Sequence, residues 1–442
     1  MMSTRRRARG MALAVSVASF SLLIAGCTAG ASSPDTQTKA VTITVALASP
    51  PPPKAALAAF TKSTGITVKW SNIDWPDLQT KITTAAEANT YFADATDVDW
   101  SRVGQLGKLN WFLPMEKYVN TKELAADMPQ LSSFTSDGHV VGIPYDASFT
   151  VTTVNKQLFS KAGITTMPTT IDSYTKDLEQ IKAKGVVQYP LNIPFAAVEG
   201  LSTYWYQTTA AFGGTILNKS GKPQFGSPDS AGYRAAQWMI NAFKTGLVPP
   251  GNINIKGGAA QQTLMAKGLV ASTFSDYAGN VGSLYDIPAS STVVGQVEYL
   301  PTPGVNGTAS NLSNPDGIGI PKAAKHPAAA AKFIEWLVSA QNQADFAGAN
   351  GANEVWSGGY TLPSRLSAIS TMVSNGKLAG GAKISSMLKS SQPVFPNGAP
   401  TWYPQFSNVI YTSLHAAAAG SMSVADAINQ MVASADKLSS GS

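Results

Sequence analysis

Apolar and polar positions near the start of the chain fall into short alternating blocks. Residues 40–49 (AVTITVALAS) place β-branched residues at alternate positions and end at four consecutive prolines, which predicts a strand that stops there. The segment that follows, KAALAAFTKSTG, has the periodicity of a helix and a glycine at its end. These blocks therefore predict a strand followed by a helix.

The same order repeats directly afterwards. The segments ITVKWSN and ADATDVDW have the pattern of strands, and PDLQTKITTAAEAN between them has the pattern of an amphipathic helix. Alternating strands and helices predict parallel crossovers in an α/β sheet, where ligands bind beyond the carboxyl ends of the strands. We therefore expect ligand contacts at the tips of the first and third strands, at Ser49, Asp99, Trp100 and Arg102.

The balance of charge argues against one class of partner. The 442-residue chain has 32 basic and 26 acidic residues, a net charge of +6. Residues 1–26 contain four arginines and no acid, so the rest of the chain has 28 basic and 26 acidic residues, a net charge of +2. We therefore expect no nucleic-acid partner and no attraction to an anionic membrane surface. A remainder of about 400 residues exceeds one hydrophobic core, so two domains are expected.

The single cysteine, Cys27, follows a distinctive amino-terminal segment. Four arginines precede an apolar run over 11–25 that is too short to span a bilayer comfortably, and small residues stand just before the cysteine. This pattern predicts a secretory signal peptide over 1–26. LIAGC resembles a bacterial lipobox, which implies cleavage before Cys27 and lipid on its thiol. Residues 27–39 are small and polar and predict a flexible tether. The alternative is a short amino-terminal helix with an isolated cysteine.

The order of further segments resembles a known family. GHVVGIPYDASFTVTTVNKQLFSKAGI is followed by AAFGGTILNKSGKPQFGSPDSAGYRAAQWMINAFKTGLV, LPTPGVNG and GIGIPKAAKHPAAAAKFIEWLVSAQNQADFA. In this order they resemble the extracellular solute-binding proteins of ABC importers, in their maltose-binding-like sugar branch. The resemblance covers about residues 40–437. The chain departs from the family pattern at Phe92, at Asp97 inside the third strand, and at NPDG over 314–317.

The resemblance implies a two-lobed periplasmic-binding-protein-like fold, with an α/β sheet in each lobe and a cleft between them. Lobe one would comprise residues 40–147 and 312–357, and lobe two residues 148–311 and 358–442. The chain would cross between the lobes near 146–151, near 303–312 and near 358–363. The resemblance also implies the function: the protein captures a sugar and delivers it to an ABC permease. It would do so as a monomer that is lipid-anchored on the extracytoplasmic face of the cell membrane.

Sugars present flat apolar faces and many hydroxyls, so a sugar site needs aromatic rings beside carboxylates and amides. Several aromatic residues of this chain stand next to acids in the sequence. The residues expected to contact the ligand are Ser49, Trp75, Asp99, Trp100, Arg102, Tyr145, Asp146, Tyr204, Trp205, Asp276, Tyr277, Asp316 and Trp402. We expect Trp100 and Tyr277 to face each other across the cleft and stack on the ligand.

Each of these residues also has a structural interpretation. Aromatic side chains are more often found in a core than in a binding site. Trp75 could pack over the start of its helix, Arg102 could pair with an acid, and Asp316 could belong to a β-turn, since Asn-Pro-Asp-Gly is a turn sequence.

Other functions have less support in the sequence. The three histidines stand far apart in unrelated contexts, and neither HExxH, GxxxxGK[ST] nor GxSxG occurs, so we expect no metal, no cofactor and no enzymatic activity. A glycoside hydrolase is an alternative, because Asp99 and Asp146 could supply its two carboxylates. A binding protein for a peptide or polyol, and a purely structural surface lipoprotein, are further alternatives.

Overall fold

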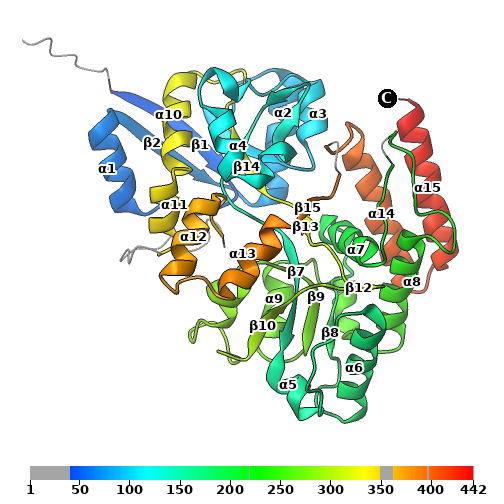
Figure 1. The fold of residues 1–442 in the computed structure, drawn as a ribbon. Coiled ribbons are helices and arrows are strands. Elements are labelled where there is room, and N and C mark those ends of the chain that lie inside the picture. Colours follow the sequence, from blue (N-terminus) through cyan, green and yellow to red (C-terminus); the bar gives the residue numbers. More distant parts are fainter. Residues whose placement is uncertain (1–39, 219, 349–361, 396–397, 442) are drawn as a thin grey trace, which may run out of the picture. The chain divides into compact units, whose positions relative to one another are not determined.

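The computed structural model describes residues 40–218, 220–348, 362–395 and 398–441 (Figure 1). The expected signal peptide, Cys27 and the tether lie outside the described residues. Most of the expected third crossing near 358–363 does so as well.

The first sheet has five strands in the order β2-β1-β3-β14-β6. Strands β1 (Val41–Leu47), β2 (Ile66–Asn72) and β3 (Ala95–Asp99) are parallel, as the alternating blocks predicted. Strand β14 (Asp316–Gly319) runs antiparallel to both β3 and β6 (Ile143–Pro144). Its register places Asp316 opposite Asp99. A late segment of the chain therefore completes the sheet and adds an acid next to the tip of β3.

Helices cover both faces of this sheet. On one face Phe60 of α1 (Lys54–Thr64) contacts Phe333 of α10 (Pro327–Leu337), with ring centroids 5.7 Å apart. Figure 1 shows these two helices beside β1 and β2. On the other face α2 (Trp75–Ala88) and α3 (Val103–Lys108) bury apolar side chains against the sheet. Helix α1 ends at Gly65, whose φ of 72° is left-handed and favours glycine.

The second sheet has four strands in the order β10-β7-β9-β8. Strand β7 (Thr150–Asn155) runs antiparallel to both β10 (Val297–Leu300) and β9 (Ser272–Tyr277). Strand β8 (Leu191–Asn192) is parallel to β9. The sheet is therefore mixed, because β7 is antiparallel to both of its neighbours whereas β8 and β9 are parallel.

Two apolar clusters sandwich the second sheet. One contains the inner faces of α5 (Lys156–Lys161), α6 (Ile171–Ala183), α7 (Glu199–Ala211), α8 (Ala231–Lys244), α14 (Tyr403–Ala418) and α15 (Val424–Ser440). The other contains α9 (Ala259–Ala266), the π-helical turn η4 (Val281–Tyr285), α12 (Leu366–Ser374) and α13 (Gly381–Lys389). Each sheet thus has its own core, which makes the fold two-lobed.

Short elements fill the connections. They are η1 (Met115–Lys117), α4 (Thr121–Asp127), η2 (Pro129–Phe134), β4 (Thr135–Ser136), β5 (His139–Val140), η3 (Pro250–Asn254), β11 (Pro303–Gly304), β12 (Gly307–Thr308), β13 (Leu312–Ser313), α11 (Ala340–Phe346) and β15 (Gln392–Pro393). None of the helices in the described segments is long and apolar enough to cross a membrane.

The chain passes between the two sheets at two places among the described residues. It leaves the first sheet after β6 and enters the second at β7, and it returns between β10 and β14. The two connecting segments lie side by side, because Phe149 and Ser313 form an antiparallel bridge and the Asn314 backbone N–H donates to the carbonyl of Ser148 at 3.2 Å. These paired segments form part of the wall of the cavity described next.

Candidate ligand-binding site

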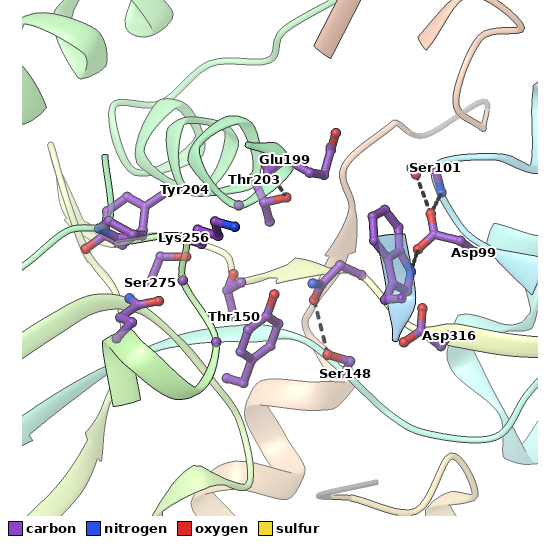
Figure 2. A pocket seen from close by; sticks show the side chains of 18 of the residues that line it. Asp99, Ser101, Ser148, Thr150, Glu199, Thr203, Tyr204, Lys256, Ser275 and Asp316 are labelled. Carbon is purple, nitrogen blue, oxygen red and sulfur yellow. Dashed lines mark hydrogen bonds between the residues drawn. The ribbon is translucent and has the colours of Figure 1, made fainter. Parts of the chain in front are cut away.

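A cavity of about 540 Å³ lies where the carboxyl ends of β3 and β9 and the start of α7 come together. Figure 2 shows Asp99, Ser101 and Asp316 on one side of it and Tyr204, Lys256 and Ser275 on the other. Its lining residues are Ala48, Trp75, Asp99, Trp100, Ser101, Ser148, Thr150, Pro194, Glu199, Gly200, Thr203, Tyr204, Lys256, Gly257, Gly258, Gln261, Ser275, Tyr277, Asn314 and Asp316. Both sheets thus supply walls to one cavity, which is large enough for a small ligand.

The residues predicted from the sequence divide between this cavity and the interior. Those that line the cavity are Trp75, Asp99, Trp100, Tyr204, Tyr277 and Asp316. Arg102 lines an adjoining cavity of about 700 Å³, which shares Trp75, Glu199, Gly200 and Lys256 with the first. The residues that line neither cavity are Ser49, Tyr145, Asp146, Trp205, Asp276 and Trp402.

Asp99 is the first carboxylate of the cavity and is held in place by its neighbours. Its Oδ1 accepts hydrogen bonds from the backbone N–H of Ser101, at 2.7 Å, and from the Ser101 hydroxyl. Its Oδ2 accepts from the indole N–H of Trp75 at 3.2 Å. The turn after β3 thereby fixes the carboxylate at the sheet edge, and the carboxylate in turn orients the Trp75 ring. The Arg102 guanidinium carbon lies 6.0 Å from the centroid of that ring.

Trp100 lines the cavity and also belongs to the core. The side chain is 9% exposed, and its ring lies 5.7 Å from that of Tyr403 and 6.3 Å from that of Phe395, measured between centroids. Cavity and core are alternatives for Trp100 in the sequence, but its position in the structure combines both. That Trp100 and Tyr277 stack on a ligand from opposite sides stays a prediction.

The two tyrosines of the cavity differ in how their hydroxyls are held. The Tyr204 hydroxyl donates to the carbonyl of Asn192 at 2.9 Å and accepts from the N–H of Phe274 at 3.1 Å, so this hydroxyl is part of the fold. Tyr277 is half-buried at the end of β9, and burial together with the nearby Asp316 raises its pKa to about 12. Tyr277 therefore stays neutral at physiological pH.

Glu199 is a cavity carboxylate that was not predicted from the sequence. It is the first residue of α7, and its carboxylate accepts hydrogen bonds from the hydroxyls of Tyr403 and, at 2.7 Å, Ser407. An acid in the first turn of a helix is also favoured by the helix dipole, so the sequence offered only a structural reason for it. Figure 2 shows Glu199 and Thr203 extending from the same end of α7.

Four aspartates form an acidic cluster around the carboxyl end of β3: Asp97, Asp99, Asp146 and Asp316. Burial is the main cause that raises the pKa of each carboxyl, and repulsion from other members of the cluster adds to it for Asp97, Asp146 and Asp316. For Asp99 the hydrogen bonds from Ser101 and Trp75 and the nearby Arg102 partly offset the effect of burial on the pKa. The pKa of Asp146 rises to about 7, although the backbone N–H groups of Asp316 and Ser148 partly offset the effect.

Asp97 lies behind the cavity and is 1% exposed. Its Oδ2 accepts a 2.6 Å hydrogen bond from Nε2 of Gln79, whereas its Oδ1 is buried without a hydrogen-bond partner. Asp97 is an unusual acid inside this strand, and no role for it was predicted from the sequence. Despite the number of acids, the described part of the chain has no group of three or more His, Cys, Asp or Glu that could hold a metal ion.

Two expected ligand-binding tryptophans lie in the core of the second lobe. Trp205 is fully buried, packs edge-on against Phe225 and donates its indole N–H to the carbonyl of Gly232 at 2.9 Å. Trp402 is buried and packs edge-on against Phe406. The expectation that Trp205 and Trp402 contact the ligand is therefore corrected. The sequence does not show that the rings of Phe225 and Phe406 cover these two side chains.

The other residues outside both cavities have structural contacts. The Asp276 carboxylate accepts four hydrogen bonds, and Asp146 accepts the backbone N–H groups of Ser148 and Asp316 at the first connection between the sheets. Tyr145 is 3% exposed and packs in the core of the first lobe. Ser49 is 3% exposed, next to the cavity residue Ala48, and its carbonyl accepts from the Trp70 indole at 2.8 Å.

Comparison with known proteins identifies the family. The family model described as bacterial extracellular solute-binding protein matches residues 48–344, more than half of the chain. The chain belongs to this family. The resemblance found in the sequence is thereby confirmed, and the matched region contains Trp75, Asp99, Glu199 and Asp316 of the cavity.

Relatives agree with the family and the fold. A binding protein of Brucella abortus is 29% identical over 196 residues, which are 43% of this chain and 46% of the relative, so the match spans about half of each. A maltose-bound protein of T. maritima has a TM-score of 0.76 at 21% identity, with 90% of this chain and 100% of that chain covered. A solute-binding protein of Agrobacterium radiobacter in complex with ribitol has a TM-score of 0.76 at 23% identity, with 90% and 99% covered. The two-lobed periplasmic-binding-protein-like fold is thus confirmed.

Proposed function

We propose that this protein binds a sugar or polyol in the cavity between its two sheets and delivers it to an ABC permease. The observation that carries the proposal is the composition of the cavity, where the rings of Trp75, Trp100 and Tyr277 adjoin the carboxylates of Asp99 and Asp316. Rings cover the apolar faces of a sugar, and carboxylates accept hydrogen bonds from its hydroxyls. Solved structures with the same fold hold maltose, D-mannitol and ribitol, which supports this ligand class.

A ligand screen tests the proposal. Residues 40–442 are titrated by calorimetry and by tryptophan fluorescence with mono- and oligosaccharides, alditols, dipeptides and spermidine. We expect heat and a fluorescence change with at least one carbohydrate, because Trp75 and Trp100 line the cavity. Binding of peptides or polyamines alone would refute the proposed ligand class. Release of reducing ends from an oligosaccharide would favour the glycoside hydrolase alternative.

We also propose that the protein is a monomeric lipoprotein on the extracytoplasmic face of the cell membrane. The support is the amino-terminal sequence, with its arginines, short apolar run and the lipobox-like LIAGC. Cys27→Ser should abolish lipid attachment and release the protein into the medium, because the lipid would be held by this thiol. Cell fractionation measures the outcome, with ligand binding unchanged as the sign of a folded protein. Retention of C27S in the membrane fraction would contradict the anchor.

A further inference from the structure

The walls of the cavity carry more acidic than basic groups. Asp99, Glu199 and Asp316 line it, and Lys256 is the one basic residue among the lining residues that the structure describes. Asp97 and Asp146 lie directly behind the first-sheet wall, close enough to repel the other carboxylates. These five carboxylates face two cations, Lys256 and the Arg102 guanidinium in the adjoining cavity.

The hydrogen bonds that these acids accept come from uncharged groups. Asp99 accepts from Ser101 and Trp75, and Glu199 accepts from Tyr403 and Ser407. Within the described segments the ion pairs lie elsewhere, between Arg365 and Asp127 and between His139 and Glu116.

One acceptor of the group is unfilled. The Oδ1 atom of Asp97 is buried without a hydrogen-bond partner, in a side chain that is 1% exposed. Removing a carboxylate from water without a partner is unfavourable unless the group is protonated or a cation approaches it. The tyrosines near the cluster, Tyr145 and Tyr277, have raised pKa values, so they stay neutral and add no negative charge.

From this arrangement we infer that the ligand is a polyhydroxy compound with a protonated amino group, such as an amino sugar or amino alditol, whose ammonium group lies beside Asp99 and Asp316. The inference rests on the proposed function and narrows its ligand class. An ammonium group has three N–H donors and one positive charge, so it can bridge the two opposed carboxylates of β3 and β14. A neutral sugar offers hydroxyl donors but brings no positive charge to these carboxyl groups.

Matched pairs of ligands test the inference. D-Glucitol is compared with 1-amino-1-deoxy-D-glucitol, D-glucose with D-glucosamine, and each amine with its N-acetyl derivative, by calorimetry at pH 7.5 in low and in high salt. We expect an amine to bind about tenfold or more tightly than its neutral partner, because charge-assisted hydrogen bonds are stronger than neutral ones. Acetylation should abolish this gain and high salt should reduce it. At pH 5 the preference should shrink, because the acids with raised pKa values become protonated.

Two variants locate the effect. Asp316→Asn should reduce the ratio of amine to neutral affinity about fivefold or more, because it removes one of the two carboxylates assigned to the ammonium group. Glu335→Gln, an exposed position on α10, removes the same charge away from the cavity and should leave the ratio unchanged. Thermal melting and binding of the neutral partner show whether each variant is folded. An unchanged ratio in folded D316N would overturn the assignment.

The outcomes separate the two proposals. If neutral sugars or alditols bind and the amines bind no more tightly, the amine inference is wrong and the proposed function stands. If no carbohydrate of either kind binds, the proposed function is wrong, and the inference falls with it. If 1,6-diaminohexane binds as tightly as the amino alditol, the hydroxyl groups are not recognised, and the ligand is a simple cation.

Discussion

Aspartates of the two sheets differ sharply in how their oxygens are used. Asp276, at the end of β9 in the second sheet, accepts from the Thr153 and Tyr285 hydroxyls at 2.6 and 2.8 Å, the Asn280 amide at 2.6 Å and the Tyr277 N–H at 2.9 Å. In the first sheet, Asp97 accepts one hydrogen bond and has a bare Oδ1, and it lies among three further acids. The second sheet encloses a carboxylate whose oxygens accept four hydrogen bonds, whereas the first sheet gathers four acids near the cavity, one of which, Asp97, has a buried oxygen without a partner.

The difference separates a structural acid from acids suited to a ligand. A buried carboxylate that receives four donors has no capacity left for a ligand and holds neighbouring elements together. Asp276 connects β9 to β7 and to the π-helical turn η4 in this way. Carboxylates with few donors keep a strong tendency to recruit a proton or a cation, which a ligand can supply.

The largest effect is expected from Asp276→Ala. The change leaves the donors of Thr153, Tyr285 and Asn280 buried without an acceptor, and each buried unsatisfied group costs about 1–3 kcal/mol. We expect the free energy of unfolding to fall by about 3 kcal/mol or more, as measured by urea denaturation followed by circular dichroism. Asp276→Asn, which keeps one acceptor oxygen, should lose less. A D276A protein of normal stability would show that the four hydrogen bonds do not hold this region together.

A smaller effect is expected from pH alone. In the folded protein Asp146 has a pKa of about 7, above its usual value of 3.8, so the folded state binds the proton more tightly than the unfolded state. The contribution of Asp146 to stability is therefore greatest at and below the usual carboxyl pKa and falls as the pH rises through about 7. The raised pKa values of Asp97, Asp99 and Asp316 act in the same direction.

Urea denaturation at intervals from pH 4 to pH 8 measures this dependence. Asp146→Asn should flatten the part of the curve near neutrality, because Asn does not titrate. A gain in stability of the wild-type protein from pH 5 to pH 8 would contradict the raised pKa values of these aspartates, since that slope requires carboxylates whose pKa values are lowered by folding.

The sequence predicted the first strands and helices of the fold better than it predicted the residues of the ligand cavity. The first three strands and two helices follow directly from local periodicity, and the tip of β3 reaches the cavity as strand-end geometry requires. Glu199 was missed because an acid at a helix start has an ordinary structural explanation. Asp276 was grouped with the ligand residues because it stands beside Tyr277 at the end of a predicted strand, and the sequence does not show that the fold brings the Thr153 hydroxyl to its carboxylate.

The aromatic residues show the same limit. Trp100 stands beside an acid in the sequence, and Trp205 and Trp402 stand beside tyrosines, yet of these three only Trp100 lines the cavity. The difference depends on which side of a helix or loop is covered by other elements, such as Phe225 against Trp205. That information is tertiary and has no local signal.

The smallest effect, and the one that most directly tests the contrast between the sheets, is expected from Asp97→Asn. The substitution keeps an acceptor for Gln79 and removes the charge from a side chain that is 1% exposed. Because burial and Asp99 raise the pKa of Asp97, its ionised form destabilises the folded state, and removing the charge relieves that cost. We expect D97N to raise the free energy of unfolding by about 1 kcal/mol at pH 8.

The same substitution should have almost no effect at pH 4, because the wild-type carboxyl is then protonated in the folded state and resembles the amide. Urea denaturation of both proteins at pH 4 and pH 8 gives the comparison, with Glu335→Gln as the control for a change in net charge. A loss of stability at pH 8 would mean that the Asp97 charge is favourable where it lies. In that case the folded protein would already stabilise the charge of Asp97. Asp97 would then no longer count among the acids that favour a cationic ligand.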